Sequence, residues 1–385
     1  MSESTNASFI ISRSILYKAL SYIVRFVDKR TISAAVVANI KILISGNFIT
    51  ISTTDERVFD AVIIKVPATI KREGSFAING STFQDIIRNL EESEVIIEQV
   101  ENILKIVCLN SEFVLPYSMY QKCYSEEEKD NFKPLCSINL FEHDIIFNKT
   151  KIAICNDETR YNLTGLYIES DNDKLIAAST DSHKLANVHC DIEVKAKIHF
   201  IMPRKAVLEI AKLDINLENK INISYLENSE NFVTKVLFHY KDDYFDITII
   251  INTLAVEFPN YKAVIPKVFD NFIIANTAGL IKIIERVSSI FSDRNKGIKL
   301  RFISENKINI SANLPDGSNA QEDFNIEYKG KINSFVVVNH GYLLDILKSL
   351  KGENIKISTL NTMGGILLHS ENDNKVLYLV MPLVT

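Results

Sequence analysis

Residues 76–100 read FAINGSTFQDIIRNLEESEVIIEQV, and this stretch decides the fold because its pattern occurs three times. A short apolar strand leads through a turn into an amphipathic helix that ends near a Leu, and a second strand follows. The same order recurs in FIMPRKAVLEIAKLDINLENKINISYL at 200–226 and in FVVVNHGYLLDILKSLKGENIKISTL at 335–360. Aligned on one acidic helix position, the copies lie 124 and 136 residues apart, which is the size of a domain. The sequence therefore predicts three copies of one domain.

A second repeated unit opens each domain. SFIISRSILYKALSYIVRFV at 8–27 aligns with NFIIANTAGLIKIIERVSSIF at 271–291, and SINLFEHDIIFNKTKIAIC at 137–155 is a weaker middle copy. An extended element with a polar turn also recurs, at 49–63, 175–188 and 308–328. Each third of the chain thus contains a strand, a helix and several strands, twice over. We expect six short helices of about 10 to 16 residues, each needing a sheet to bury its apolar stripe.

These repeats predict an α+β fold of three domains, each with two helices packed on antiparallel sheets. The boundaries fall in polar stretches. YSEEEKDNFKP at 124–134 is a charged linker that ends in Pro, and FPNYKAVIPK at 258–267 is a second Pro-marked junction. We place the domains at residues 1–130, 136–258 and 261–385.

Composition excludes several classes of protein. Hydrophobic residues make up 46% of the 385 residues and charged residues 24%, as in an ordinary soluble globular protein. No run of 18 uncharged apolar residues occurs, so we expect no membrane span. The five Cys are odd in number and irregularly spaced, which favours reduced, mostly buried thiols in a cytoplasmic protein over a disulfide framework or a zinc site. We expect no metal and no cofactor.

Basic residues recur on the polar sides of the expected helices or beside them. They are Lys18, Arg25, Arg88, Lys149, Lys151, Arg204, Lys205, Lys212, Lys282, Arg286, Lys348 and Lys351. Solvated helix faces carry such residues in any protein, which is the simpler interpretation. The alternative is a basic lining that contacts phosphates without base recognition. The net charge of −5 argues against DNA binding by bulk charge but permits a local basic surface.

Five motifs, read together, resemble one family over essentially the whole chain. They are RYNLTG at 160–165, TDSHKLA at 180–186, MPRK at 202–205, FPNYKAVIPK at 258–267 and YLVMPL at 378–383. Their order and spacing resemble the bacterial DNA polymerase III beta subunits, the sliding clamps. The resemblance implies a head-to-tail homodimer whose six domains close into a ring around duplex DNA. It also implies processivity without catalysis, with the polymerase III catalytic subunit, the clamp loader and other proteins carrying a clamp-binding motif as partners.

The family has a groove between its second and third domains that takes a short, largely apolar peptide. The positions that match this partner groove are Leu163, Thr180, His183, Lys184, Leu185, Pro259, Val264, Met363, Gly365, Leu379, Val380, Met381, Pro382 and Leu383. A buried edge strand is the simpler interpretation of the terminal VMPL. Several residues depart from the family pattern, namely Ser182 for Gly, Lys184 and Ala263 for Arg, and Val384 and Thr385 for a basic ending. We therefore expect a groove rim that is less basic than usual.

The resemblance also assigns DNA contacts and a ring interface. Arg160 and Tyr161 lie on a loop before the groove strand, and Arg30 lies in the loop at 28–40. The expected DNA contacts are these three residues together with Lys18, Arg25, Arg88, Lys149, Arg204, Lys205, Lys212, Lys282, Arg286 and Lys348. For the interface, Ile290 and Phe291 are expected to meet Phe113 and Leu115, with ion pairs from Glu322 and Asp323.

Two other classes of function stay open at this level. The first is a non-catalytic protein-binding scaffold of the same fold that does not close on DNA. Polar residues at 290 and 291 would favour it, but Ile290 and Phe291 are apolar. The second is an enzyme with an unrecognised site, although the chain carries no GxxxxGK[ST], GxGxxG or GxSxG motif. We expect a clamp without a catalytic site of its own.

Overall fold

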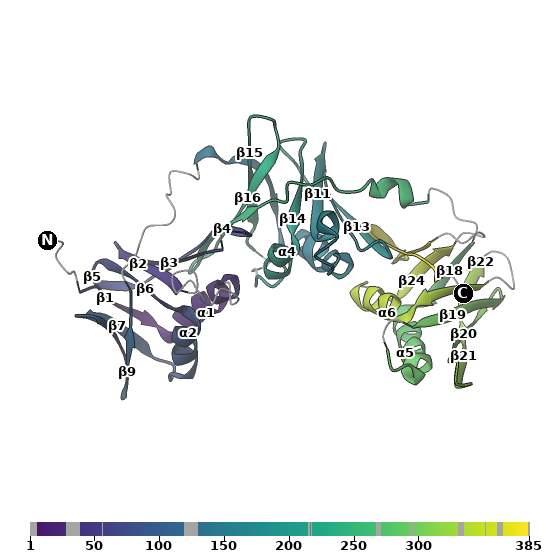
Figure 1. The fold of residues 1–385 in the computed structure, drawn as a ribbon, viewed down its shortest axis with the longest axis horizontal. Helices are drawn as coiled ribbons and strands as arrows, with labels where there is room; N and C mark the ends of the chain where they lie inside the picture. The colour runs from purple at the N-terminus through teal and green to yellow at the C-terminus, as the bar shows by residue number, and fades with distance from the viewer. Residues whose placement is uncertain are drawn as a thin grey trace. The chain divides into compact units, whose positions relative to one another are not determined.

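The computed structural model describes residues 6–27, 39–55, 57–118, 130–214, 216, 218–266, 271–293, 296–329, 335–350, 352–359 and 365–383. The chain forms two compact units (Figure 1). The first unit comprises Met1–Phe141, Ile192–Ala196 and Leu208–Leu254. The second comprises Glu142–Asp191, Lys197–Val207 and Ala255–Thr385.

The first unit contains two antiparallel sheets. In the five-stranded sheet the strand order is β5 (Thr69–Arg72), β1 (Ser8–Ser12), β7 (Glu94–Val100), β8 (Ile103–Cys108), β9 (Ser111–Pro116). In the eight-stranded sheet it is β10 (Lys133–Ile138), β15 (Ile221–Glu227), β16 (Val233–Lys241), β17 (Asp246–Asn252), β4 (Phe59–Pro67), β3 (Phe48–Asp55), β2 (Asn39–Ser45), β6 (Gly74–Asn79).

The second unit also contains two antiparallel sheets. The nine-stranded sheet has the order β14 (His199–Pro203), β11 (Gly165–Asp171), β12 (Lys174–Thr180), β13 (Lys184–Asp191), β26 (Asp373–Val380), β25 (Ile366–Ser370), β24 (Asn354–Thr359), β18 (Asn271–Asn276), β22 (Glu327–Lys329). The four-stranded sheet has the order β21 (Asn319–Asn325), β20 (Lys307–Asn313), β19 (Gly297–Ser304), β23 (Phe335–Asn339).

Helices cover one side of these sheets. They are α1 (Arg13–Ile23), α2 (Gly80–Asn89), α3 (Leu140–His143), α4 (Arg204–Ile210), α5 (Thr277–Val287) and α6 (His340–Ser349). Short 3-10 and π segments accompany them: η1 (Val24–Phe26), η3 (Asp144–Asn148), η4 (Lys151–Ala153), η5 (Tyr161–Leu163), η6 (Tyr261–Val264) and η7 (Ser288–Ile290). Helix α1 packs against α2, and α5 packs against α6 (Figure 1).

The repeats expected from the sequence are confirmed. The strand–helix–strand unit appears as β6-α2-β7, β14-α4-β15 and β23-α6-β24, and the opening unit as β1-α1 and β18-α5. Three helices share the same N-terminal cap. The side-chain oxygens of Asn79, Asn276 and Asn339 accept hydrogen bonds from the backbone amides three residues later, at 3.0, 2.8 and 3.2 Å. The same capping residue therefore stops a strand and starts a helix in each case.

The expected helix length is correct for α1, α2, α5 and α6 but wrong for the central copies. Helix α3 has 4 residues and passes into the 5-residue π segment η3, and α4 has 7 residues. At the end of α4 the backbone tightens, because Lys212 N donates to Glu209 O at 3.2 Å and Leu213 N donates to Ile210 O at 3.0 Å. These three-residue turns end the helix before its apolar pattern ends.

Two non-local strand ladders explain why the residues group into two units rather than three. Strand β4 of the first third pairs with β17 of the central third, with Ile64 opposite Ile247. Strand β13 of the central third pairs with β26 of the last third, with Leu185 opposite Leu379. Each ladder joins strands from two successive sequence repeats into one sheet. The domain boundaries at 1–130, 136–258 and 261–385 therefore stay predictions.

Cys108, Cys136, Cys155 and Cys190 are buried, as expected, whereas Cys123 lies outside the described residues. Among the helices of the described ranges, none combines the length and apolar character that a membrane span requires.

Candidate functional site

Three of the expected groove residues, Thr180, Leu185 and Leu379, lie on one face of the nine-stranded sheet. Along β12 and β13, Ala177, Ser179 and Ala186 are buried on the side of η3 and η4, where the Ser179 hydroxyl donates to Thr150 O at 2.6 Å. Side chains alternate along a strand, so Thr180 and Leu185 lie on the opposite face, called here the outer face. Thr180 pairs with Leu185, and Leu185 pairs with Leu379. Register thus brings three groove residues from three strands into one row.

The hairpin turn between β12 and β13 is fixed by its own side chains. Asp181 Oδ1 accepts hydrogen bonds from the amides of His183 and Lys184, at 2.9 and 2.8 Å. The Thr180 hydroxyl accepts from Ser182 N at 3.1 Å and donates to Lys184 O at 2.8 Å. Ser182 has a φ of +76°, which is the left-handed conformation that explains why Gly is usual at this position.

The terminal segment divides into a buried part and an exposed part. Leu379 and Val380 are buried in β26, so the simpler interpretation as a packed strand holds for them. After the strand, Met381 N donates to His183 O and Leu383 N donates to Val337 O, both at 2.8 Å. Met381 and Leu383 remain 43% and 39% exposed and are available to a partner. Gly365 packs closely on Leu379, because a Cβ there would lie 2.8 Å from Leu379 Cδ1.

Lys184 lies on the side of the helices rather than on the outer face. Its ammonium sits 4.3 Å from the centre of the Tyr342 ring, in a cation–π contact, and 3.8 Å from Asp181 Oδ2. Burial raises the pKa of Tyr342, and the charge of Asp181 adds to this effect. The adjacent residues Lys184 and Leu185 therefore lie on opposite faces of the sheet. Tyr342 is a residue that the sequence analysis missed, since its place in a helical pattern does not reveal its neighbour on another strand.

The connector, residues 258–266, crosses the outer face. Tyr167 of β11 stacks on Phe258, with ring centres 5.0 Å apart, and it lies 5.9 Å from Tyr261. Glu169 holds the connector as well, accepting a hydrogen bond from Tyr261 Oη at 3.1 Å and pairing with Lys262 Nζ at 2.5 Å. Burial together with Glu169 raises the pKa of Tyr167 to about 12. This aromatic anchor leaves the expected groove residues Pro259 and Val264 exposed.

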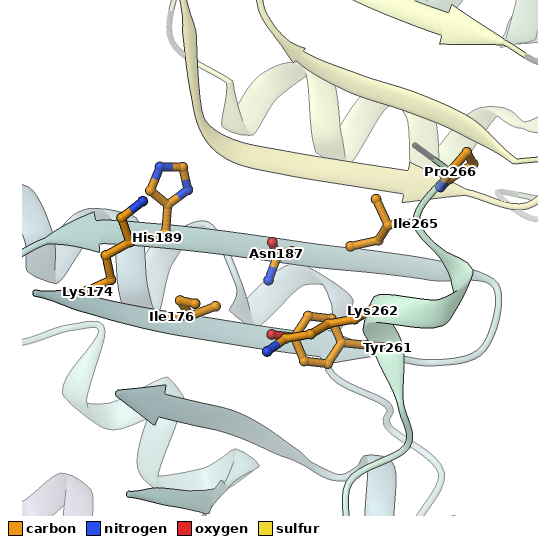
Figure 2. Close-up of a pocket in the computed structure, with 8 residues that line it drawn as sticks. All are labelled: Lys174, Ile176, Asn187, His189, Tyr261, Lys262, Ile265 and Pro266. Atoms are coloured by element: carbon orange, nitrogen blue, oxygen red, sulfur yellow. The ribbon is translucent and has the colours of Figure 1, made fainter. Parts of the chain in front are cut away.

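A pocket of about 380 Å³ adjoins the connector on the same outer face (Figure 2). It is lined by Lys174, Ile176, Asn187, His189, Tyr261, Lys262, Ile265 and Pro266. In Figure 2 the Asn187 side chain projects from the sheet, Tyr261 extends from the connector toward it, and Ile265 and Pro266 lie farther along the connector. The sequence analysis did not identify this pocket, because its lining joins two strands to a segment that lies more than 70 residues later.

The expected DNA-contact loop rests against the hairpin turn. Asp157 Oδ1 accepts from the amide and the hydroxyl of Thr159, at 3.0 and 2.7 Å, and these bonds lower the pKa of Asp157. Arg160 Nη1 donates to Asp181 O at 3.1 Å. Tyr161 is 57% exposed, so its ring is open to a ligand, whereas Leu163 is buried at the end of η5.

Most of the described basic residues on the helices face an acidic neighbour. The ion pairs are Lys18–Asp214 (3.5 Å), Arg88–Asp85 (3.0 Å), Lys212–Glu209 (2.8 Å), Arg286–Glu322 (2.6 Å) and Lys348–Glu285 (2.6 Å). Arg25 instead donates to Lys212 O at 3.3 Å, Lys282 is exposed, and Arg204 and Lys205 are partly buried. Exposed pairs of this kind contribute little to stability, so a phosphate can compete for the cation.

Lys149 was expected to contact DNA, and the structure corrects this expectation. It is only 8% exposed, and its ammonium donates to the carbonyl oxygen of Ser349 and lies 3.9 Å from Asp144. A lysine held inside the protein does not meet a phosphate. Arg30, Met363, Lys351, Val384 and Thr385 lie outside the described residues, so their expected roles stay predictions.

The two expected interface segments lie at sheet edges. Strand β9, with Phe113 and Leu115, ends the order of its sheet, and so does β21, with Glu322 and Asp323. Ile290 and Phe291 are partly buried at the end of η7. Arg286 binds Glu322 through Nε at 3.0 Å and Nη2 at 2.6 Å and thereby lowers the pKa of Glu322. Asp323 accepts from Asn309 Nδ2 at 2.9 Å. Both acids are therefore already engaged within their own domain.

The chain is similar to known proteins over nearly its whole length. Models for the N-terminal, central and C-terminal domains of the DNA polymerase III beta subunit match residues 7–122, 139–260 and 262–384. The beta sliding clamp of Rickettsia bellii is 26% identical over 97% of this chain and 98% of its own length. That of Buchnera aphidicola subsp. Rhopalosiphum padi is 27% identical over 97% and 98%. The crystal structure of the DNA polymerase sliding clamp from Bacillus subtilis, 25% identical, matches 99% of this chain and 100% of its own with a TM-score of 0.88.

Proposed function

Because this chain belongs to the family of DNA polymerase III beta subunits, we propose that it works as a DNA sliding clamp in replication. The observation that carries the proposal is the ordered match of all three domains of the family along one chain. The relatives that it resembles over nearly their whole length are beta sliding clamps. A scaffold that does not close on DNA is not favoured.

We propose that two copies join head to tail, β9 of one against β21 of the other. An edge strand offers unpaired backbone groups, and joining two edges satisfies them in a continuous sheet. Apolar side chains lie on both candidate sides, Phe113 and Leu115 on one and Ile290 and Phe291 on the other. Six domains would then surround the duplex, and the tether to DNA would be topological.

Duplex DNA would meet the helices through weak and mobile phosphate contacts. The exposed cations Lys282, Arg88 and Lys212 support this, and the acidic neighbours of Arg88 and Lys212 weaken their phosphate contacts, which suits sliding. Arg160 and Tyr161 would add contacts from the loop beside the groove. The protein would supply no catalytic group of its own.

The outer face at Thr180, Leu185, Leu379 and Met381 would take a short apolar peptide from the replicative polymerase, the clamp loader and other proteins with a clamp-binding motif. An apolar row with exposed ends and a few polar anchors suits a peptide that binds and leaves quickly. The cytoplasmic location also stays a prediction.

Native mass in solution, measured together with small-angle scattering, tests the ring. We expect twice the chain mass and a scattering profile with a hollow centre. A single-chain mass that persists at high protein concentration would overturn the ring and favour the scaffold. Retention on closed circular DNA after assisted loading, with release when the circle is cut, tests the sliding itself.

A further inference from the structure

The hairpin turn beside the groove holds a strained residue. Ser182 has a φ of +76°. This backbone region is higher in free energy for a residue that has a side chain than for Gly. Such strain persists where surrounding contacts hold it, and it is a reason to look for a role. The Ser182 hydroxyl is a group that Gly would lack, and it faces Arg160 Nη1 at 3.4 Å.

Arg160 joins the DNA-contact loop to this turn. Its Nη1 donates to Asp181 O at 3.1 Å, and the Ser182 hydroxyl lies beside the same nitrogen. The other edge of the guanidinium is held more loosely, with Nε 3.7 Å from Asp157 Oδ2. The planar guanidinium of Arg160 thus contacts the turn through Nη1 and faces Asp157 of the loop through Nε.

The turn and the loop that Arg160 joins both form hydrogen bonds with groove residues. The carbonyl oxygen of His183, one residue after Ser182, accepts the amide hydrogen of Met381 at 2.8 Å. The carbonyl oxygen of Arg160 itself accepts from Leu163 N at 2.8 Å. Arg160 therefore joins a turn and a loop whose backbone carbonyl groups accept hydrogen bonds from the groove residues Met381 and Leu163.

We propose that Arg160 is a positioning residue that couples the two binding events, so that duplex DNA and a partner peptide each bind more tightly when the other is present. The proposal rests on the proposed function. A phosphate takes the Nε and Nη2 edge of Arg160 in place of Asp157, while Nη1 stays on Asp181 and Ser182. Phosphate binding then strengthens the hold of Arg160 on the turn before the peptide arrives, and linkage requires the same factor in the opposite direction.

The test measures peptide affinity with and without DNA, on the full chain. The probes are a fluorescein-labelled peptide with two Leu and one Phe within five residues, and a short DNA duplex with a single-stranded overhang. For the unaltered protein, saturating DNA should strengthen peptide binding about fivefold, the lower end of typical coupling. Arg160→Lys keeps the charge but loses the planar fork, so the ratio should fall to about one. Ser182→Gly should give a ratio between that of the unaltered protein and one.

Arg301→Lys is the matched control, since Arg301 is exposed on β19, in the four-stranded sheet rather than in the sheet that carries the turn. It should keep the fivefold ratio. A ratio of one in the unaltered protein, or weaker peptide binding with DNA, overturns the coupling while leaving the proposed function in place. A ratio that survives Arg160→Lys overturns the role of Arg160. If the unaltered protein binds neither probe, the proposed function fails, and the coupling fails with it.

Discussion

The hydroxyl group of Tyr378 donates a hydrogen bond to the carbonyl oxygen of Lys149, at 2.8 Å. The Ser349 hydroxyl forms a hydrogen bond with the same Tyr378 oxygen at 2.7 Å. The Lys149 ammonium donates a hydrogen bond to the Ser349 carbonyl oxygen. Tyr378 belongs to β26, Ser349 ends α6, and Lys149 follows η3. The network thus ties the terminal strand to a helical segment of the preceding domain, beneath the candidate groove.

Tyr378→Phe should destabilise the protein by about 1–3 kcal/mol, because it leaves buried partners without the hydroxyl. Chemical denaturation followed by circular dichroism measures the change. Tyr244→Phe is the control, since Tyr244 is exposed, and it should change the stability by less than about 0.5 kcal/mol. Equal effects from both variants would contradict the assigned role of the network.

Ser182→Gly should stabilise the protein by about 0.5–1 kcal/mol, because Gly adopts the left-handed conformation without a steric cost. Ser224→Gly in β15 is the matched control and should destabilise by a similar amount, since Gly weakens a strand interior. Thermal or chemical unfolding of both variants gives the comparison. Loss of stability in Ser182→Gly would show that the Ser182 side-chain contacts outweigh the backbone strain.

Ile290→Ala combined with Phe291→Lys should give folded monomers, because the change removes apolar area and places a charge at the proposed junction. Analytical ultracentrifugation reports the mass, and circular dichroism the fold. Phe48→Lys, at an exposed aromatic residue of β3, should leave the dimer intact. A double variant that remains dimeric would falsify the interface assignment.

Removal of residues 381–385 should weaken binding of the labelled peptide by at least about tenfold while sparing the dimer. The cut follows Val380, so β26 and its pairing with Lys184 remain. Met381→Ser should have a smaller effect in the same direction, and Leu109→Ser, on an exposed residue of the first domain, should have none. Peptide affinity that survives the truncation would place the groove elsewhere.

Lys282→Gln should lower the slope of log affinity for DNA against log salt by about one unit, as expected for one lost phosphate contact. Lys149→Gln should leave the slope unchanged, because Lys149 is buried, although it should lower the stability. Lys71→Gln on β5 serves as the surface control. A slope altered equally by all three would indicate bulk charge rather than a lining of helices.

The sequence was a good guide to local structure. Apolar periodicity located both repeated units, and Asn79, Asn276 and Asn339 mark helix starts because a short polar side chain caps a helix within its own segment. The departure at Ser182 also coincides with an unusual backbone conformation. Thr180, Leu185 and Leu379, which the resemblance assigns to one groove, are neighbours in the strand register, while their role in binding a partner stays a prediction.

What the sequence determined by itself is the repeat, the kind of each element and the face that it buries, because these depend on side chains a few residues apart. Only the tertiary structure decided that Lys149 is buried against Ser349, that Lys184 meets Tyr342, and that Arg160 reaches Asp181. Periodicity says that a lysine lies on a polar face. Whether that face meets solvent or another strand depends on ladders such as β13–β26, which join residues nearly 200 positions apart.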